Sequence, residues 1–400
     1  MDDLEKWRPE FPILSRSVYL ISNSLGAMPR KTADSLADYA TSWATRGVRA
    51  WEDRWWEMAQ EVGDRIGGMI GAPPGSVSMH ENVTTAQMVV LSTLPVPVGP
   101  RAATRRKIVC LEMDFPSLIY LYRAHADLGF ELEIVPGEPD YSVAIDRLLA
   151  AIDDRTALVA LSHVLFRSSY IMDPEPVVRR AHQVGALVVL DAYQSAGIIP
   201  LDVSALGVDF AVGGCLKWLC GGPGNSFLYT RPILRSQVRP RYTGWLANRN
   251  PFAFDIDALD RRDDAMGMMN GTPAIPAYYA AIPGLEIVQE VGVDRIRAKS
   301  KKMTARLLDL VDCHGFTTVA SRDPERLAGT VAVQVPDGMA VSRVLKERDF
   351  LVDYRPGVGI RISPHFYNTF DEIDAIMAEI QRIVSGKEYA ARSPGRSLVT

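Results

Sequence analysis

The spacing of apolar and polar positions changes twice along the chain, and each change marks a region with a different kind of element. In the first region apolar residues such as Leu36, Tyr39 and Trp43 recur at helical spacing. This pattern predicts a helix from about Lys31, followed by a second, Trp-rich helical stretch. Residues 1–30, which precede these helices, are expected to form an N-terminal arm.

In the second region, between residues 77 and 229, short β-branched runs alternate with helical segments. The runs are apolar almost throughout, which is typical of strands covered on both faces, and parallel sheets are covered in this way. One helix is clearly marked, because Asp173 can cap it, Pro174 suits its first turn and Gly185 can end it. We therefore expect an α/β domain with a mainly parallel sheet. The expected strands are 107–111, 131–135, 156–161, 186–191, 208–212 and 226–229.

The third region begins near residue 276 and changes character again. A long helix is expected from Asp294, and a half-buried strand follows at 331–335. The last helix should open with a capping box from Thr369 to Glu372. These elements predict a small α+β domain. The expected division of the chain is an arm at 1–30, a large α/β domain at 31–275, a small C-terminal domain at 276–386 and a tail at 387–400.

Composition limits the classes of function that the chain can have. A length of 400 residues suits two domains. The net charge of -4 gives no basic surface for nucleic acid and no polybasic membrane patch. No apolar run approaches the ~20 residues of a membrane span. The 4 scattered cysteines suggest reduced thiols in a cytoplasmic protein, and the 6 histidines show no metal-ligand spacing.

The chemistry-bearing residues gather between 186 and 230. Asp191 ends an expected buried strand, and ligands of open α/β sheets bind beyond the carboxyl ends of the strands. Lys217 follows the next expected strand, amid glycines that allow close approach to a flat ring. A carboxylate and a lysine so placed suit pyridoxal 5′-phosphate (PLP): Asp191 pairs with the pyridine nitrogen and Lys217 forms the imine. The alternative is a helix-capping Asp and a solvated Lys.

Three further motifs of the chain resemble those of one family. The segments Asn23-Ser24-Leu25-Gly26, Phe115-Pro116-Ser117 and Gly359-Ile360-Arg361-Ile362-Ser363 occur in the order seen in kynureninases. The chain therefore resembles fold-type-I PLP enzymes of the class V aminotransferase group, and most closely kynureninases, over nearly its whole length. The resemblance implies fold type I and a homodimer with shared active sites.

The resemblance also implies roles for single residues. Asp191 and Lys217 match the pyridine partner and the imine-forming lysine of the family. Arg361 matches the arginine that holds the substrate carboxylate, although an arginine in an alternating strand can also be solvated. The remaining cofactor-binding residues implied are Val83 and Thr84 at the phosphate, Phe115 on the ring, Gln194, Trp245, and Thr272 reaching the phosphate across the dimer. The remaining substrate-binding residues implied are Asn23 and Ser24.

Four positions depart from the kynureninase pattern. Leu216 stands where the family has Tyr, Gln194 where it has His, Leu118 where it has Asp, and Cys215 where it usually has Ser. These changes keep the cofactor chemistry plausible, but they remove a phosphate contact and polar groups tied to the kynureninase reaction.

The expected function is that of a PLP enzyme acting on a small-molecule amino acid, with kynureninase-like hydrolytic cleavage of the Cβ–Cγ bond of a γ-keto amino acid. Three alternatives stay open. The first is amino transfer by a class V aminotransferase, or another PLP reaction such as elimination or decarboxylation. The second is a cysteine desulfurase, for which Cys313 lacks the required loop. The third is a PLP-binding protein without turnover.

Overall fold

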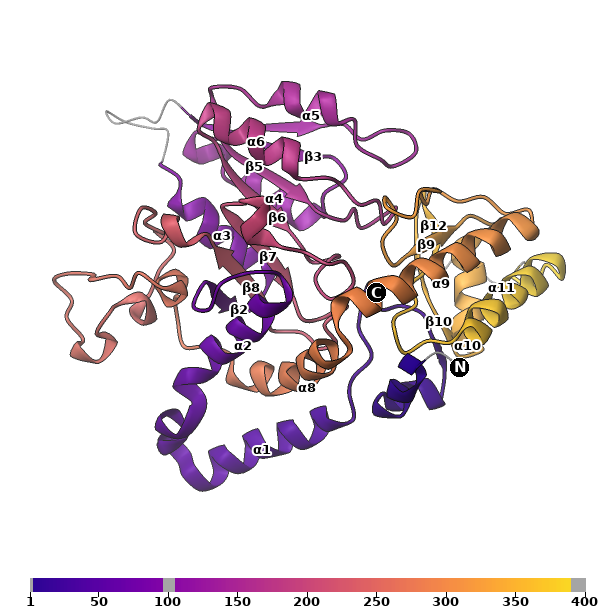
Figure 1. The fold of residues 1–400 in the computed structure, drawn as a ribbon, viewed down its shortest axis with the longest axis horizontal. Helices are drawn as coiled ribbons and strands as arrows, with labels where there is room; N and C mark the ends of the chain where they lie inside the picture. The colour runs from indigo at the N-terminus through magenta and orange to yellow at the C-terminus, as the bar shows by residue number, and fades with distance from the viewer. Residues whose placement is uncertain (1–2, 96–104, 390–400) are drawn as a thin grey trace.

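The computed structural model describes residues 3–95 and 105–389. Most of the expected tail, from residue 390 onward, lies outside the described residues. Figure 1 shows a large sheet with helices on one side of the molecule and a smaller sheet with α10 and α11 on the other. Helix α9 (Val293–Cys313) runs from the first of these bodies to the second. None of the described helices is long and apolar enough to cross a membrane.

The large sheet has seven strands in the described residues, in the order β2-β8-β7-β6-β5-β3-β4. The pairings from β7 through β6, β5 and β3 to β4 are parallel, and β8 pairs antiparallel with both β7 and β2. This mainly parallel sheet confirms the predicted α/β fold class. The strands are β2 (Val77–His80), β3 (Lys107–Leu111), β4 (Glu131–Val135), β5 (Thr156–Ser162), β6 (Leu187–Asp191), β7 (Phe210–Gly214) and β8 (Ser226–Thr230).

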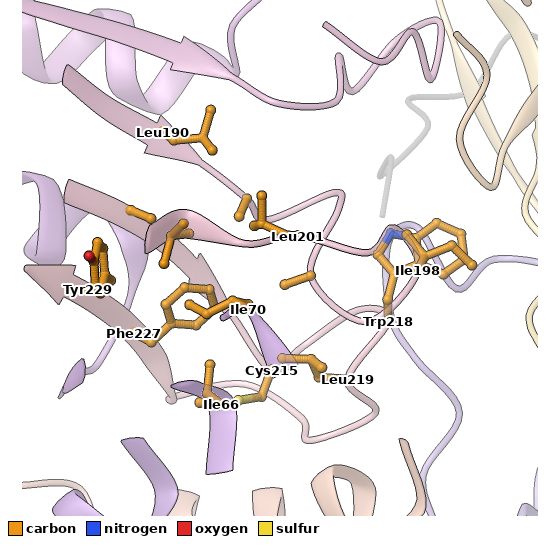
Figure 2. Packing of buried hydrophobic residues seen from close by; sticks show 14 of the residues in the cluster. Ile66, Ile70, Leu190, Ile198, Leu201, Cys215, Trp218, Leu219, Phe227 and Tyr229 are labelled. Carbon is orange, nitrogen blue, oxygen red and sulfur yellow. The ribbon is translucent and has the colours of Figure 1, made fainter. Parts of the chain in front are cut away.

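Helices cover both faces of this sheet, which explains why the strands are apolar almost throughout. One buried cluster includes Val89 and Leu121 from α3 and α4, and a larger cluster includes Ile66 from α2 and Val177 from α6. Figure 2 shows part of the larger cluster. The helices of this body are α1 (Lys31–Arg46), α2 (Trp56–Met69), α3 (Val83–Thr93), α4 (Pro116–Ala124), α5 (Ile145–Ala151), α6 (Glu175–Val184), α7 (Val203–Leu206) and α8 (Ile275–Val291).

The smaller body has a three-stranded antiparallel sheet in the order β11-β12-β9, with its own apolar cluster. The predicted capping box is confirmed, because Thr369 and Glu372 each accept the other's backbone N–H. Helix α8 begins at the expected domain boundary, yet its apolar residues pack in the core of the large body. The elements are β9 (Val331–Val333), α10 (Gly338–Glu347), β10 (Phe350–Leu351), β11 (Asp353–Arg355), β12 (Gly359–Ile362) and α11 (Phe370–Ser385).

The N-terminal arm connects the small body to the segment that carries Lys217. Its strand β1 (Val18–Tyr19) pairs in parallel with β10, and Arg8 donates two hydrogen bonds to the Glu372 carboxylate at 2.9 and 3.0 Å. Further along the arm, Gly26 N–H donates to the Leu216 carbonyl at 2.9 Å. The arm therefore fixes the backbone beside Lys217 from outside the sheet.

This contact generates a prediction about Gly26. A Cβ atom at Gly26 would lie 2.1 Å from the Lys217 carbonyl oxygen, so the backbone must shift in Gly26→Ala. We expect a lower melting temperature, with a loss of about 1–3 kcal/mol of stability, and weaker cofactor loading. In the matched variant Gly68→Ala the new Cβ meets nothing within 4 Å. This substitution should leave cofactor loading unchanged and raise the free energy of unfolding by about 0.5–1 kcal/mol. Equal behaviour of the two variants would contradict the docking of the arm on this segment.

Candidate active site

Two residues expected from the sequence, Asp191 and Lys217, lie on adjoining segments beyond neighbouring strands. Asp191 is the last residue of β6, and Lys217 follows β7, which pairs in parallel with β6. The Lys217 amine lies 4.4 Å from the ring centre of Tyr193. Asp191 Oδ1 accepts the Tyr193 N–H at 2.8 Å, and among the described residues no donor reaches its Oδ2. One carboxylate oxygen thus remains for a ligand.

Burial changes the protonation of both groups. It lowers the pKa of the Lys217 amine from its ordinary value, and the nearby Arg361 and Arg355 lower it further, whereas Asp191 opposes the shift. Burial also raises the pKa of the Asp191 carboxyl, while the Tyr193 N–H and Lys217 oppose this shift. The amine is therefore more readily neutral, and so more nucleophilic, than that of a solvated lysine.

Both residues line one cavity of about 230 Å³. Its wall is apolar on several sides and carries a small number of polar groups, as is usual for cofactor sites. Phe115, predicted to pack on the ring, lines this cavity and meets Phe166 edge to face, with ring centres 5.3 Å apart. The lining residues are Asn82, Val83, Thr84, Phe115, Ser117, Leu118, Ser162, Val164, Phe166, Asp191, Tyr193, Gln194, Leu216 and Lys217.

The first turn of α3, which carries Val83 and Thr84, lines the cavity. The helix is capped by Asn82, whose side chain accepts the Thr85 N–H at 2.9 Å. The first N–H groups of an α-helix have no partner within the helix, and together with the helix dipole they favour an anion. Both residues predicted to meet the phosphate are thus at a place where a phosphate group fits.

Gln194 lies at another wall of the cavity, with its side-chain amide held at both ends. Its Nε2 donates to the Asn23 carbonyl at 3.1 Å, and its Oε1 accepts from the Trp218 indole N–H at 3.2 Å. The loop after β6, the arm and the segment after Lys217 therefore meet at this amide.

Arg361 lies on β12 and is almost completely buried. Its Nε donates to Asp353 Oδ1 at 2.8 Å, its Nη2 donates to the other carboxylate oxygen, and its Nη1 donates to the Phe166 carbonyl. Arg355 also pairs with Asp353, at 3.1 Å. Two arginines thus contact one carboxylate, and both lie close enough to Lys217 to lower the pKa of its amine.

The two other expected substrate-binding residues lie in the arm. Asn23 is 2% exposed, and neither polar atom of its side chain has a hydrogen-bond partner among the described residues. A buried amide without partners is costly, so this side chain is suited to bind a ligand. Ser24 is partly buried, and its N–H donates to the Ile21 carbonyl at 2.9 Å.

Trp245 and Thr272, two expected cofactor residues, are not brought into this cavity. Trp245 lies in the short helix η7 (Trp245–Ala247) and packs against Trp56, with ring centres 5.7 Å apart. Thr272 is exposed. Within a single chain, neither side chain lines the space between Asp191 and Lys217.

Sequence reasoning missed several residues of the site. Ser162 ends β5 directly beside Asp191 in the parallel register, and Phe166 follows four residues later. Ser162 donates its hydroxyl at 2.7 Å to Asp114, a buried carboxylate that also accepts the Leu111 N–H. The signal that could have found Ser162 was its place after an apolar run, since neighbouring parallel strands end at the same edge. No comparable signal marks Asp114 or Tyr193.

The fold, with a lysine and a carboxylate beyond neighbouring parallel strands and a helix end suited to an anion, is that of a fold-type-I PLP enzyme. Comparison with known proteins agrees. Residues 18–376 match the family model described as Aminotransferase class-V. The chain is 30% identical over 376 residues to the uncharacterized aminotransferase YcbU of Bacillus subtilis, covering 94% of this chain and 97% of that protein. It is 29% identical over 403 residues to kynureninase of Pseudomonas fluorescens, covering 97% and 94%.

Solved structures show the same fold. An apo cysteine desulfurase from Thermococcus onnurineus NA1 aligns with a TM-score of 0.83 at 21% identity, covering 96% of this chain and 98% of that one. A C-DES mutant with glycine linked to PLP aligns with a TM-score of 0.84 at 20% identity, covering 94% and 98%. The chain belongs to the class V aminotransferase family, and it is a PLP-dependent enzyme.

The residues present fit this cofactor. Asp191 Oδ2 lacks a donor among the described residues, as a partner of the protonated pyridine nitrogen should. The Lys217 amine has no hydrogen bond within the described residues. It lines the same cavity as Val83 and Thr84 in the first turn of α3. Residues that would hold PLP are therefore Lys217 at the aldehyde, Asp191 at the ring nitrogen, Phe115 beside the ring, and Val83 and Thr84 at the phosphate.

The altered pKa of Lys217 predicts how fast the apoenzyme takes up its cofactor. Because the neutral amine is the nucleophile, the rate of uptake should rise with pH around a midpoint well below 10.5, the ordinary value for lysine. Asp191 favours the charged amine, so Asp191→Asn should move this midpoint lower still. Stopped-flow absorbance of apoenzyme mixed with PLP measures the pH midpoint of uptake in the parent enzyme and in the variant. A midpoint near that of free lysine, or an upward shift in Asp191→Asn, contradicts this view of the site.

Proposed function

We propose that this enzyme removes the Cα proton of an α-amino acid with Lys217, and that a kynureninase-like hydrolytic cleavage of the Cβ–Cγ bond of a γ-keto amino acid follows. The observation that carries the proposal is a partly buried lysine amine that shares its cavity with Asp191 and has a lowered pKa. Full-length similarity to kynureninases supports the choice of reaction.

Each residue has a separate task in this proposal. PLP supplies an electron sink when it is bound, and Asp191 keeps its ring nitrogen protonated. Arg361, held by Asp353 on β11, pairs with the substrate carboxylate and orients the amino acid. The Lys217 amine, once released from the cofactor, takes the Cα proton and holds it within the cavity. Water then adds to the γ-carbonyl, the Cβ–Cγ bond breaks, and the products are a carboxylic acid and alanine.

Amino transfer is the second candidate, and a specific observation favours it. Leu216 and Leu118 line the cavity where kynureninases have Tyr and Asp. Neither side chain can donate a proton to a leaving group or orient water. Amino transfer needs neither task, because Lys217 alone can move the proton away from Cα. The similarity to an uncharacterized aminotransferase fits this candidate as well.

The proposal includes a homodimer in which each subunit completes the other's site. The expected cofactor residues Trp245 and Thr272 lie outside the cavity of their own chain, and Thr272 is exposed. Exposed apolar residues near Trp245, including Phe252 and Phe254, suit contact with a second copy. A cytoplasmic location also stays a proposal.

An amino-acid panel that includes kynurenine and 3-hydroxykynurenine tests the function. We expect kynurenine to yield anthranilate and alanine, detected by product mass, and we expect Lys217→Ala to lose both this turnover and the visible absorbance of the lysine-bound cofactor. Lys301→Ala, which removes a partly exposed lysine that pairs with Glu325, is the control and should leave both unchanged. Conversion of the cofactor to its pyridoxamine form would favour amino transfer, whereas a coloured, active Lys217→Ala enzyme would refute the lysine assignment.

Arg361→Lys tests the carboxylate contact with its positive charge retained. Lysine lacks the planar fork, so KM for the amino acid should rise about 10- to 100-fold, as loss of a hydrogen bond to a charged group predicts, with a smaller change in kcat. Arg306→Lys removes a similar fork from a surface pair with Asp374 and should change neither constant. An unchanged KM in Arg361→Lys removes Arg361 from the substrate site.

A further inference from the structure

Trp218, the residue directly after Lys217, is buried in the core, where Figure 2 shows it among the cluster of apolar side chains. Its position is fixed from two sides. The His365 ring meets the indole edge to face, with ring centres 5.3 Å apart, and His365 Nε2 donates to the Trp218 carbonyl at 2.9 Å. The indole N–H points to Gln194 Oε1, 3.2 Å away.

The two partners of Gln194 allow only one orientation of its amide. An indole N–H can only donate, so Gln194 must present its oxygen to Trp218. The Asn23 carbonyl can only accept, so Gln194 must present its NH₂ group there, at 3.1 Å. A rotated amide would set donor against donor at one end and acceptor against acceptor at the other. Both contacts are buried, which makes such a mismatch costly.

This orientation leaves one hydrogen of the Gln194 NH₂ group without an acceptor among the described residues. Gln194 lines the same cavity as Asp191 and Lys217. We propose that Trp218 is a positioning residue that holds the Gln194 amide with an N–H donor toward the bound cofactor, where it serves the phenolic oxygen next to the aldehyde carbon. This inference rests on the cofactor site of the proposed function and assigns Trp218 a task beyond core packing.

The expected effect on the cofactor has a definite direction. A donor to the phenolic oxygen stabilises its negative charge most when the lysine-bound cofactor has lost its proton. Removing the donor therefore raises the pH midpoint of the visible absorbance. Gln194→Leu should raise it by about one pH unit, the size expected for one hydrogen bond to a charged oxygen. Trp218→Phe should raise it by about half as much, because the Asn23 carbonyl still holds the amide.

The experiment is an absorbance titration of the holoenzyme in a double-mutant cycle. In the Gln194→Leu background, Trp218→Phe should add no further shift, because it acts only through the amide. The matched control is Trp55→Phe, since Trp55 is also buried and donates its indole N–H to a side chain, the Tyr279 hydroxyl, at 3.4 Å. This control should leave the midpoint unchanged. No shift in Trp218→Phe, or the same shift in both backgrounds, overturns the proposal.

A second measurement covers the case in which Trp218→Phe does not fold. With ¹⁵N at the indole nitrogens of the 7 tryptophans, one N–H signal should move and exchange faster with solvent in Gln194→Leu than in the parent holoenzyme. A spectrum in which no indole signal responds overturns the proposal. Failure of the cofactor site itself is distinguishable, because the parent protein would then show no visible band to titrate.

Discussion

Partial removal of the Lys217 amine from water, beside the Asp191 carboxylate, is the interaction on which the site depends. Burial disfavours the charged form of the amine, whereas the Asp191 carboxylate favours it. The balance gives an amine that can attack an aldehyde and later accept a proton near neutral pH. A solvated lysine at the same position in the sequence could do neither efficiently, so the chemistry depends on the fold that buries it.

Three parts of the fold produce this burial. Parallel strands β6 and β7 bring Asp191 and the segment before Lys217 to one edge of the sheet. The N-terminal arm closes over that segment through the Gly26 N–H, and it also carries the Asn23 carbonyl that holds Gln194. The small body supplies Arg361 on β12. Because the arm and the small body form hydrogen bonds to residues that line the cavity, a change in either should reach the cofactor.

Much of this could be predicted from sequence, for identifiable reasons. Continuous apolar runs predicted parallel strands, and the strand end at Asp191 with the glycine-flanked Lys217 pointed to two residues that the structure places in one cavity. The ion pair between Arg361 and Asp353 could not be predicted, since it depends on the register of two antiparallel strands. Asp114 was missed because a single carboxylate after a strand looks like any turn residue. The position of Trp245 outside its own cavity is likewise a property of tertiary packing, which no local pattern encodes.

The covalent link proposed at Lys217 can be tested directly. Reduction of the purified holoenzyme with borohydride fixes the cofactor to its lysine, and mass spectrometry of the peptides then identifies the modified residue. We expect stoichiometric modification of Lys217, with other lysines such as Lys299 and Lys301 unmodified. Modification at any other lysine, or a protein that retains PLP but carries no reducible link, would contradict the central claim.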